Sequence, residues 1–184
     1  MNEIEILKKI EKKVLWLACW MIHNANHIRE NQDGLKVGGH QASSASIVSI
    51  MSALYFSILR PEDRVAVKPH ASPVFHAIQY LSGLQTKEKI ENFRGFGGAQ
   101  SYPSRTKDID DVDISTGSVG LGVAMTSFIS LIQDYIARKK FYKNKPLGRM
   151  IALVGDAELD EGNVYECLQE GWKHDLRNVW WIID

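Results

Sequence analysis

Few cysteines and no surplus of charge mark this sequence of 184 residues. Cys19 and Cys167 show neither CxxC spacing nor a nearby pair of histidines, and each falls in an apolar helical pattern, where cysteine behaves as a small hydrophobic residue. This usage excludes a disulfide framework and indicates a reducing, cytoplasmic setting. The 22 lysines and arginines balance 22 aspartates and glutamates, so no net field draws the molecule to nucleic acid or anionic lipid.

Long apolar runs and the familiar phosphate-binding fingerprints are also missing. The amino terminus lacks the cationic start and apolar core of a signal peptide, and the apolar run at residues 14–22 is too short to cross a bilayer. Neither a GxxxxGKS/T motif nor GxGxxG occurs, so a P-loop and a dinucleotide site are both unsupported. We therefore expect a cytoplasmic protein without a membrane or nucleic-acid partner, with enough chain for one domain.

Helical and strand patterns alternate along the chain. Apolar residues at three- and four-residue steps predict helices, and short apolar runs predict strands. Ser72 before Pro73 is typical of a helix start at which serine caps the exposed N–H groups. The expected order is helix 4–21, helix 47–58, strand 64–68, helix 72–83, helix 86–94, a glycine-rich loop at 95–105, a helix entered through the glycines at 117–122 and ending near 141, strand 150–154, helix 161–173 and strand 178–184.

This order predicts an α/β fold, with a parallel sheet and helices on both of its faces. The last strand is a continuous apolar run suited to a buried position, and it ends at Asp184, where the next loop should begin. We therefore expect the domain to be incomplete at its C-terminus. The chain is expected to consist of an N-terminal helical segment, residues 1–33, followed by a partial α/β domain, residues 34–184.

The strongest local candidate for chemistry is Asp156, which follows Gly155 directly after the strand at 150–154. Ligands of open parallel sheets bind at the carboxyl ends of the strands, and a carboxylate there is a hard oxygen ligand suited to magnesium. A plain strand-Gly-Asp turn is the alternative. The glycines at 117, 120 and 122 allow close backbone approach to a flat ligand, or else tight packing of a helix start on the sheet.

Histidines in loops form a second set of candidates. His40 ends a Gly-Gly turn, His70 follows a strand and Pro69, and His76 lies shortly after it. Each of them, taken singly, is also compatible with a satisfied structural histidine, the class to which we assign the histidines at 23, 27 and 174. The acidic cluster at Glu158, Asp160 and Glu161 is typical of a solvated helix start that complements the helix dipole.

Six motifs in a fixed order resemble the transketolase-like family of thiamine diphosphate enzymes. They are GGHQAS at 38–43, PHASP at 69–73, NFRGF at 92–96, SYP at 101–103, ISTGSVGLG at 114–122 and GDAELDEG at 155–162. Within that family the chain is more similar to the homodimeric first component of the pyruvate dehydrogenase complex than to transketolase itself. The GGH and PHASP motifs carry this preference, together with Tyr102, which stands where transketolases usually have a histidine.

The resemblance implies two cofactors, thiamine diphosphate and Mg²⁺, held by the domain that we now identify as diphosphate-binding. Asp156 would ligate the metal. The other implied cofactor-binding residues are His40, Ser43, His70, Gly117, Val119, Gly155, Ala157 and Glu158. His40, His70 and Tyr102 are the implied catalytic candidates. Ala157 replaces the second glycine that the family usually has, which matters if that position needs a positive φ.

The resemblance also implies a reaction and partners: decarboxylation of pyruvate and transfer of the acetyl group to a lipoyl-bearing acyltransferase. The site would be completed by a pyrimidine-binding domain of the same or a second subunit, in a homodimer. The family's metal-binding asparagine belongs to the loop that follows the strand ending at Asp184. We therefore expect this chain by itself to be inactive, whatever cofactor is supplied.

Three alternatives stay open. The first is a transketolase that moves two-carbon units between sugar phosphates, for which Arg94 and Arg105 are the loop candidates to grip the phosphate. The second is a non-catalytic fragment that oligomerises through the helix at 117–141. The third is magnesium-dependent phosphoryl transfer at Asp156, which no second acidic strand end or phosphate loop supports.

Overall fold

The computed structural model describes residues 2–30, 34–141 and 146–184, and the chain divides into two compact units. Unit 1 comprises Met1–Leu59 and Pro69–Val112, and unit 2 comprises Arg60–Lys68 and Asp113–Asp184. Each unit is therefore built from two separate stretches of sequence. The division at residue 34 that the sequence suggests stays a prediction.

Unit 1 is helical. Its elements are α1 (Glu3–His23), a π-helical turn (Asn24–Ile28), α2 (Gln41–Ala53), a second π-helical turn (Leu54–Ile58), a 3-10 turn (Pro69–Ala71), α3 (Ser72–Leu81) and α4 (Lys87–Glu91). A capping box starts α1, because Asn2 and Glu5 each accept the backbone N–H of the other. The apolar stripe expected for α1 is buried in the second half of the helix, where Val14, Leu17 and Met21 lie and α1 packs on α2 and α3.

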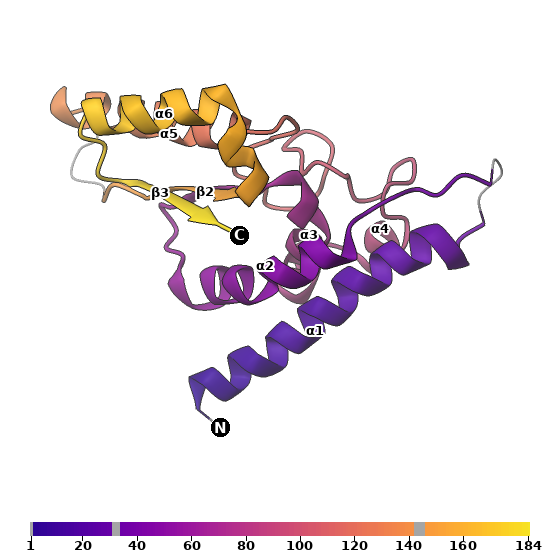
Figure 1. Cartoon of the computed structure of the whole chain (residues 1–184). Coiled ribbons are helices and arrows are strands. Elements are labelled where there is room, and N and C mark those ends of the chain that lie inside the picture. Colours follow the sequence, from indigo (N-terminus) through magenta and orange to yellow (C-terminus); the bar gives the residue numbers. More distant parts are fainter. Residues whose placement is uncertain (1, 31–33, 142–145) are drawn as a thin grey trace. The chain divides into compact units, whose positions relative to one another are not determined.

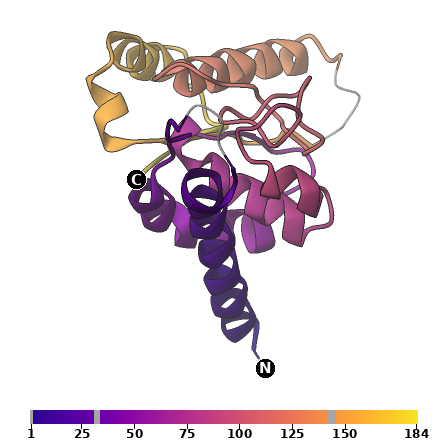
Figure 2. The same cartoon turned by 90° about the vertical axis from the view of Figure 1, so that its right-hand side faces the viewer.

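The amino-terminal part of α1 extends beyond the other helices of its unit, as the indigo helix in Figure 2 shows, and Ile4 is 63% exposed there. One helical stretch of unit 1, Gln41–Ile58, is long and apolar enough to cross a membrane by length and composition alone. A core helix passes the same test, and here Ile47, Val48 and Met51 are buried while α2 packs against α1 and α3. Packing inside the unit therefore buries part of this apolar stretch, whereas Ile58 at its end is exposed.

Unit 2 is a three-stranded parallel sheet with helices on it. Its elements are β1 (Arg64–Ala66), α5 (Leu121–Arg138), β2 (Met150–Val154), a 3-10 turn (Asp156–Asp160), α6 (Gly162–Lys173) and β3 (Val179–Ile183). The strands lie in the order β1-β2-β3, and Ile114 forms a further parallel bridge to Ala66. Figure 1 shows α5 and α6 side by side above β2 and β3, where Val123, Val154 and Val164 pack together. The predicted α/β fold with parallel strands is confirmed.

The amino-terminal ends of β1 and β2 are joined by a buried ion pair. Asp63 accepts the backbone N–H of Arg149 at 2.7 Å, the Nε–H of Arg149 at 3.0 Å and the backbone N–H of Arg60 at 2.9 Å. Burial of the Asp63 carboxyl opposes its ionisation, but these hydrogen bonds outweigh burial and lower the pKa of Asp63 well below its usual range. Gly148 allows the approach, since a Cβ there would lie 1.9 Å from the carbonyl oxygen of Glu62.

Three expectations about the elements need correction. Ser72 is the first residue of α3 and Ala71 is its cap, because the 3-10 turn at Pro69–Ala71 runs straight into the helix; the buried Ser72 hydroxyl has no partner among the described residues. β3 is only partly buried, since it is the outer strand of the described sheet, and Ile183 is exposed. The helix expected to reach residue 141 ends at Arg138.

Candidate functional site

The carboxyl ends of the strands in unit 2 bring together several of the predicted site residues. Asp156 follows Gly155 at the end of β2, and its side chain is exposed. Its backbone N–H donates to the carbonyl oxygen of Asp184 at 3.0 Å, directly after β3, and its Oδ1 accepts the N–H of Ala157 at 2.8 Å. The backbone of Asp156 is therefore fixed by the sheet while its carboxylate is exposed, so that its oxygens are accessible to a ligand.

Glu158 joins the strand-end turn to the glycine segment before α5. Its Oε2 accepts the N–H of Gly155 at 2.7 Å and its Oε1 accepts the N–H of Gly120 at 3.0 Å. Both oxygens are thus used inside the protein, so Glu158 shapes the site by holding two loops together. By itself the sequence suggested a solvated helix start for this acidic residue, and the family resemblance implied a place in the cofactor site.

The two glycines before α5, Gly117 and Gly120, have different surroundings. Gly120 has φ 77°, and a Cβ there would lie 2.5 Å from Oδ1 of Asn163, so both conformation and space require glycine. Gly117 and Val119 are exposed, which leaves their backbone groups at the surface of the strand-end region. Thr116 anchors the segment to the end of β1 through a 2.9 Å hydrogen bond from its hydroxyl to the Val67 carbonyl.

Ala157 stands where the family usually has glycine, and its backbone shows that this change is tolerated. It lies in the 3-10 turn, and among the described residues that are not glycine a positive φ occurs at Arg94, Lys140 and Asp175 but not at Ala157. The substitution therefore imposes no left-handed strain on the turn.

Lys68 is a charged residue of this region that sequence analysis missed. Its Nζ lies 2.5 Å from Oδ2 of Asp184, and the two side chains are only 7% and 8% exposed. The same Nζ would lie 3.9 Å from a Cβ placed on Gly155. The positively charged ammonium group of Lys68 therefore lies beside the carboxyl ends of the strands. A signal was present, because a lysine directly after an apolar strand and before Pro69 must lie at the carboxyl end of that strand.

In unit 1 the structure brings two predicted histidines together. The rings of His40 and His70 have centroids 4.8 Å apart and planes inclined by 54°, and both residues are exposed. His40 is the N-cap of α2 and Ser43 lies half-buried in the first turn of that helix, whereas His70 lies in the turn before α3. The Gly-Gly turn before His40 is held by Asn26, which bonds both the N–H and the carbonyl of Gly38.

Tyr102 and Arg94 belong to the loops of the same unit. Tyr102 is 52% exposed. Arg94 is half-buried and donates from Nη1 to the Val37 carbonyl at 3.1 Å; burial lowers the pKa of Arg94, and the nearby Tyr102 hydroxyl opposes that shift. Arg94 therefore connects the segment that carries Tyr102 to the turn before His40. Arg105, the other arginine considered for a sugar phosphate, is exposed.

His76, Asp108 and Asp110 form an acidic cluster that the sequence did not predict, although His76 was a candidate by itself. One ligand atom of each lies within 4.8 Å of the others, so the three side chains are of types and spacing that can hold a cation. Hydrogen bonds already occupy most of these atoms, since Asp108 accepts two backbone N–H groups and His76 contacts Asp110 and the Gln100 carbonyl.

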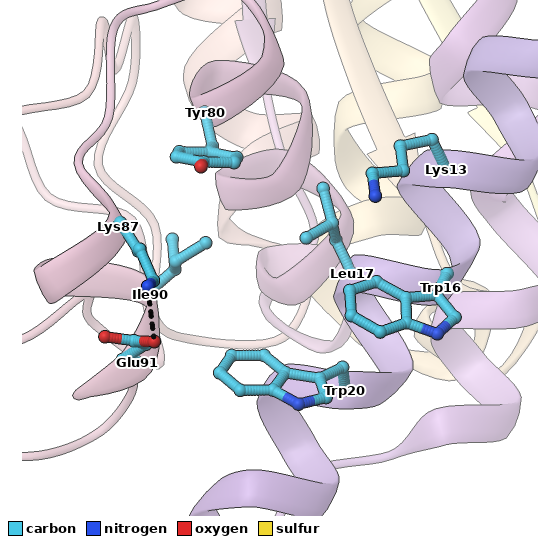
Figure 3. Close-up of a pocket in the computed structure, with 8 residues that line it drawn as sticks. All are labelled: Lys13, Trp16, Leu17, Trp20, Tyr80, Lys87, Ile90 and Glu91. Carbon is cyan, nitrogen blue, oxygen red and sulfur yellow. Dashed lines mark ion pairs between the residues drawn. The ribbon is translucent and has the colours of Figure 1, made fainter.

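Two concave regions lie apart from the predicted site residues. One, of about 230 Å³, lies in unit 1 and is shown in Figure 3, where the lining side chains converge from α1, α3 and α4; they are Lys13, Trp16, Leu17, Trp20, Tyr80, Lys87, Ile90 and Glu91. The other, of about 420 Å³, lies between α5 and α6 and includes Cys167. Burial raises the pKa of the Cys167 thiol, and Glu166 and Glu170 add to the shift, which disfavours the reactive thiolate.

Comparison with known proteins agrees with this geometry. The family described as "Transketolase, thiamine diphosphate binding domain" matches residues 38–182. The pyruvate dehydrogenase E1 component of Mycolicibacterium smegmatis is 25% identical over 98% of this chain, which covers 20% of that protein. The pyruvate dehydrogenase E1 component of Escherichia coli is 25% identical over 100% of this chain, which covers 21% of that protein. Transketolase-like protein 2 of Mus musculus is 29% identical over 79% of the chain, which covers 24% of that protein.

Solved structures show the same fold. Transketolase from Leishmania mexicana superposes with a TM-score of 0.82 at 18% identity, over 97% of this chain and 27% of that one. This chain spans about a fifth of the length of the pyruvate dehydrogenase relatives. The match over residues 38–182, with the predicted parallel sheet and strand-end aspartate in place, shows that the chain belongs to the family of transketolase thiamine diphosphate binding domains.

Proposed function

We propose that this chain is the diphosphate-binding portion of a pyruvate dehydrogenase first component, which decarboxylates pyruvate and transfers the acetyl group to lipoyl. The observation that carries the choice of reaction is coverage: relatives named pyruvate dehydrogenase E1 match 98–100% of the chain, including α1, whereas the transketolase-like relative matches 79%. The cofactor supplies the electron sink for cleavage beside a carbonyl, and the protein supplies position, charge and exclusion of water.

The residues at the strand ends of unit 2 suit a metal-bound diphosphate. Asp156 offers an exposed carboxylate on a fixed backbone, and a hard oxygen ligand of this kind would hold Mg²⁺, whose charge would offset that of the diphosphate. Gly155 and Ala157 flank it with backbone groups. Glu158 holds Gly120 beside the turn, and the exposed Gly117 and Val119 offer backbone groups to the aminopyrimidine ring.

The exposed histidines of unit 1 are assigned to the same cofactor. His40 and His70 present donors from a preformed ring pair, with Ser43 one turn along α2, and we assign them to the diphosphate and the thiazolium side. Tyr102 is assigned to the reacting side of the cofactor. A pyrimidine-binding domain of the same or a second subunit, in a homodimer, completes the site, and a lipoyl-bearing acyltransferase receives the product.

Calorimetric titration of the full-length protein tests the cofactor assignment. Thiamine diphosphate is expected to bind in the presence of Mg²⁺ and to lose its affinity when EDTA replaces the metal. Equal affinity with and without Mg²⁺, or no binding at all, would contradict the proposal. Free thiamine, which lacks the diphosphate, is the matched ligand control and is expected to bind far more weakly.

Transketolase activity is the second candidate, favoured by the 29% identity to the mouse transketolase-like protein and by the fold. The two reactions are separated by supplying the full-length protein either with pyruvate and a lipoyl acceptor or with a ketose phosphate donor and an aldose phosphate acceptor. Turnover of pyruvate alone supports the first assignment. Turnover of the sugar phosphates alone transfers it to the second and makes Arg94 and Arg105 the residues to examine.

A further inference from the structure

The segment Gln100–Ser104, which carries Tyr102, lies outside the helices and strands of unit 1. An exposed tyrosine on such a segment has no ladder of backbone hydrogen bonds to fix it, and loops of this kind move on nanosecond to microsecond timescales unless side chains hold them. Two side chains hold it, Asp108 and His76, and Asp110 contacts His76.

Asp108 grips the segment on both sides of Tyr102. One carboxylate oxygen accepts the Gln100 N–H at 3.0 Å and the other accepts the Ser104 N–H at 2.8 Å. The N–H of Asp108 in turn donates to the Ser104 carbonyl at 3.0 Å. A single carboxylate thus fixes the two peptide groups that flank the tyrosine, through charge-assisted hydrogen bonds that are stronger than neutral ones.

His76 holds the other side of Gln100. Its Nε2 lies 2.8 Å from the Gln100 carbonyl, and because a carbonyl only accepts, Nε2 must carry the hydrogen. Its Nδ1 contacts the Asp110 carboxylate, and both side chains are fully buried. The rings of Phe75 and Phe93 enclose the histidine at centroid distances of 5.7 and 6.1 Å.

The position of His76 connects this grip to the histidine pair. His76 lies on α3, which begins directly after the turn that contains His70. The backbone of Gln100 is therefore held at its N–H by Asp108 and at its carbonyl by a helix whose start is fixed beside His70. Arg94, bonded to the Val37 carbonyl and close to Tyr102, extends the connection to the turn before His40.

We propose that Asp108 and His76, with Asp110 behind it, are positioning residues that hold Gln100–Ser104 so that Tyr102 is presented next to the loops of His40 and His70. This inference rests on the proposed function for the role of Tyr102. The grip itself, meaning the hydrogen bonds from Asp108 and His76 to the backbone of Gln100 and Ser104, can be measured without cofactor. A metal shared by the three side chains is the competing explanation of the same cluster. The hydrogen bonds that already occupy Asp108 and His76 favour the grip.

Amide exchange of the full-length protein, followed by mass spectrometry with fragmentation to single amides, tests the grip. Loss of a charged hydrogen bond should speed exchange of Gln100 and Ser104 about 10- to 150-fold in Asp108→Ala. Asp111→Ala, an exposed aspartate of the same loop, is the matched control and should leave both rates unchanged. Unprotected amides in the parent protein would overturn the proposal, as would protection that disappears with EDTA and returns with Zn²⁺.

A double-mutant cycle tests whether the grip acts through Tyr102. Asp108→Ala should lower kcat while the dissociation constant for thiamine diphosphate stays unchanged, and it should add no further loss in a Tyr102→Phe background. Additive losses would reduce Asp108 to a general stabiliser and overturn the positioning role. His76→Gln, which keeps a donor for the Gln100 carbonyl, should retain more activity than His76→Phe. If His76→Phe does not fold, the activity of His76→Gln is compared with that of the parent protein instead.

The two failures are distinguishable. If the parent protein does not bind thiamine diphosphate, the proposed function fails while amide exchange still decides whether Asp108 holds the segment. If the cofactor binds and turns over but the cycle is additive, the proposed function stands and the positioning role fails.

Discussion

The strand-end region of unit 2 and the loop region of unit 1 are held in place by different means. In unit 2, Asp156 is fixed by backbone pairing, because its N–H continues the ladder between β2 and β3. In unit 1, the segment around Tyr102 is fixed by side chains, chiefly the carboxylate of Asp108. A backbone-held site needs only the strands to form, whereas a side-chain-held site depends on the identity of individual residues such as Asp108.

This contrast predicts how each region responds to substitution. In unit 2, a change at the site should abolish binding without affecting the fold, and a change at the opposite end of the sheet should do the reverse. In unit 1, each substitution should lower cofactor affinity or activity only in part, because several weaker contacts contribute. Four substitutions sharpen or break the comparison, in order of expected effect.

Asp156→Ala should abolish Mg²⁺-dependent binding of thiamine diphosphate in the full-length protein. It removes the exposed anionic ligand and no core volume, so the free energy of unfolding should change by no more than about 0.5 kcal/mol. Calorimetry measures the binding and urea denaturation the stability. Asp160→Ala, an exposed carboxylate in the same turn, is the control and should bind normally. An unchanged dissociation constant for Asp156→Ala would contradict the metal assignment.

Asp63→Asn acts at the amino-terminal end of the same sheet and should cost about 3–5 kcal/mol of stability, because Arg149 loses its buried partner. Cofactor affinity of the protein that remains folded should be unchanged. The lowered pKa of Asp63 also fixes the sign of the pH dependence: its contribution is fully present above the ordinary aspartate pKa of about 3.9 and is lost as the pH falls below it.

Urea denaturation from pH 7 down to pH 3 measures this effect. The parent protein should lose stability steeply in acid, and Asp63→Asn should show a shallower acid limb from a lower starting value. Asp160→Asn serves as the control for charge removal and should follow the parent. Parallel curves for the parent and Asp63→Asn would mean that other carboxylates govern acid unfolding.

His70→Ala should weaken thiamine diphosphate binding by about 1.5–3 kcal/mol, the value of one hydrogen bond to a charged group, or roughly 10- to 150-fold in the dissociation constant. The loss should be smaller than that of Asp156→Ala, because His40 stays in place beside it. His174→Ala, an exposed histidine of unit 2, is the control. Equal affinities of His70→Ala and the parent would return His70 to the structural histidines.

Thr86→Ala should have the smallest effect. Thr86 is the N-cap of α4 and accepts the Lys89 N–H at 3.3 Å, so its loss should cost about 1 kcal/mol of stability. Cofactor affinity should stay the same. Thr106→Ala, an exposed threonine of the loop after Tyr102, tests whether any threonine gives this result. A change in cofactor affinity on Thr86→Ala would show that α4 is coupled to the site.

The sequence predicted the elements of unit 2 well because their signals are local. A continuous apolar run marks β2 to the residue, and Gly155-Asp156 after it locates the strand-end aspartate. The place of β3 at the edge depends on which strands lie beside it, which its own apolar pattern does not encode. Lys68 was missed because its significance comes from Asp184, more than a hundred residues away.

The loop contacts of unit 1 were less predictable for a different reason. The motifs containing His40 and His70 predicted that both belong to one site, and the structure places their rings together. No pattern in the sequence pairs Asp108 with the amides of Gln100 and Ser104, or His76 with Asp110, since short polar loops contain many such residues. The choice of Ser72 as a cap failed because a preceding 3-10 turn leaves no cap position to fill.

The burial of α3 affects how rarely this helix opens. Eight consecutive residues, from Ser72 to Gln79, are buried, so this helix should open only with the whole unit, whereas the loops joined to it fluctuate much faster. His76 lies within this slow segment and His70 directly before it. The distance between the turn that contains His70 and the Gln100–Ser104 segment, which His76 contacts, should therefore stay constant while ligands bind and leave many times. Each new ligand should meet the same arrangement.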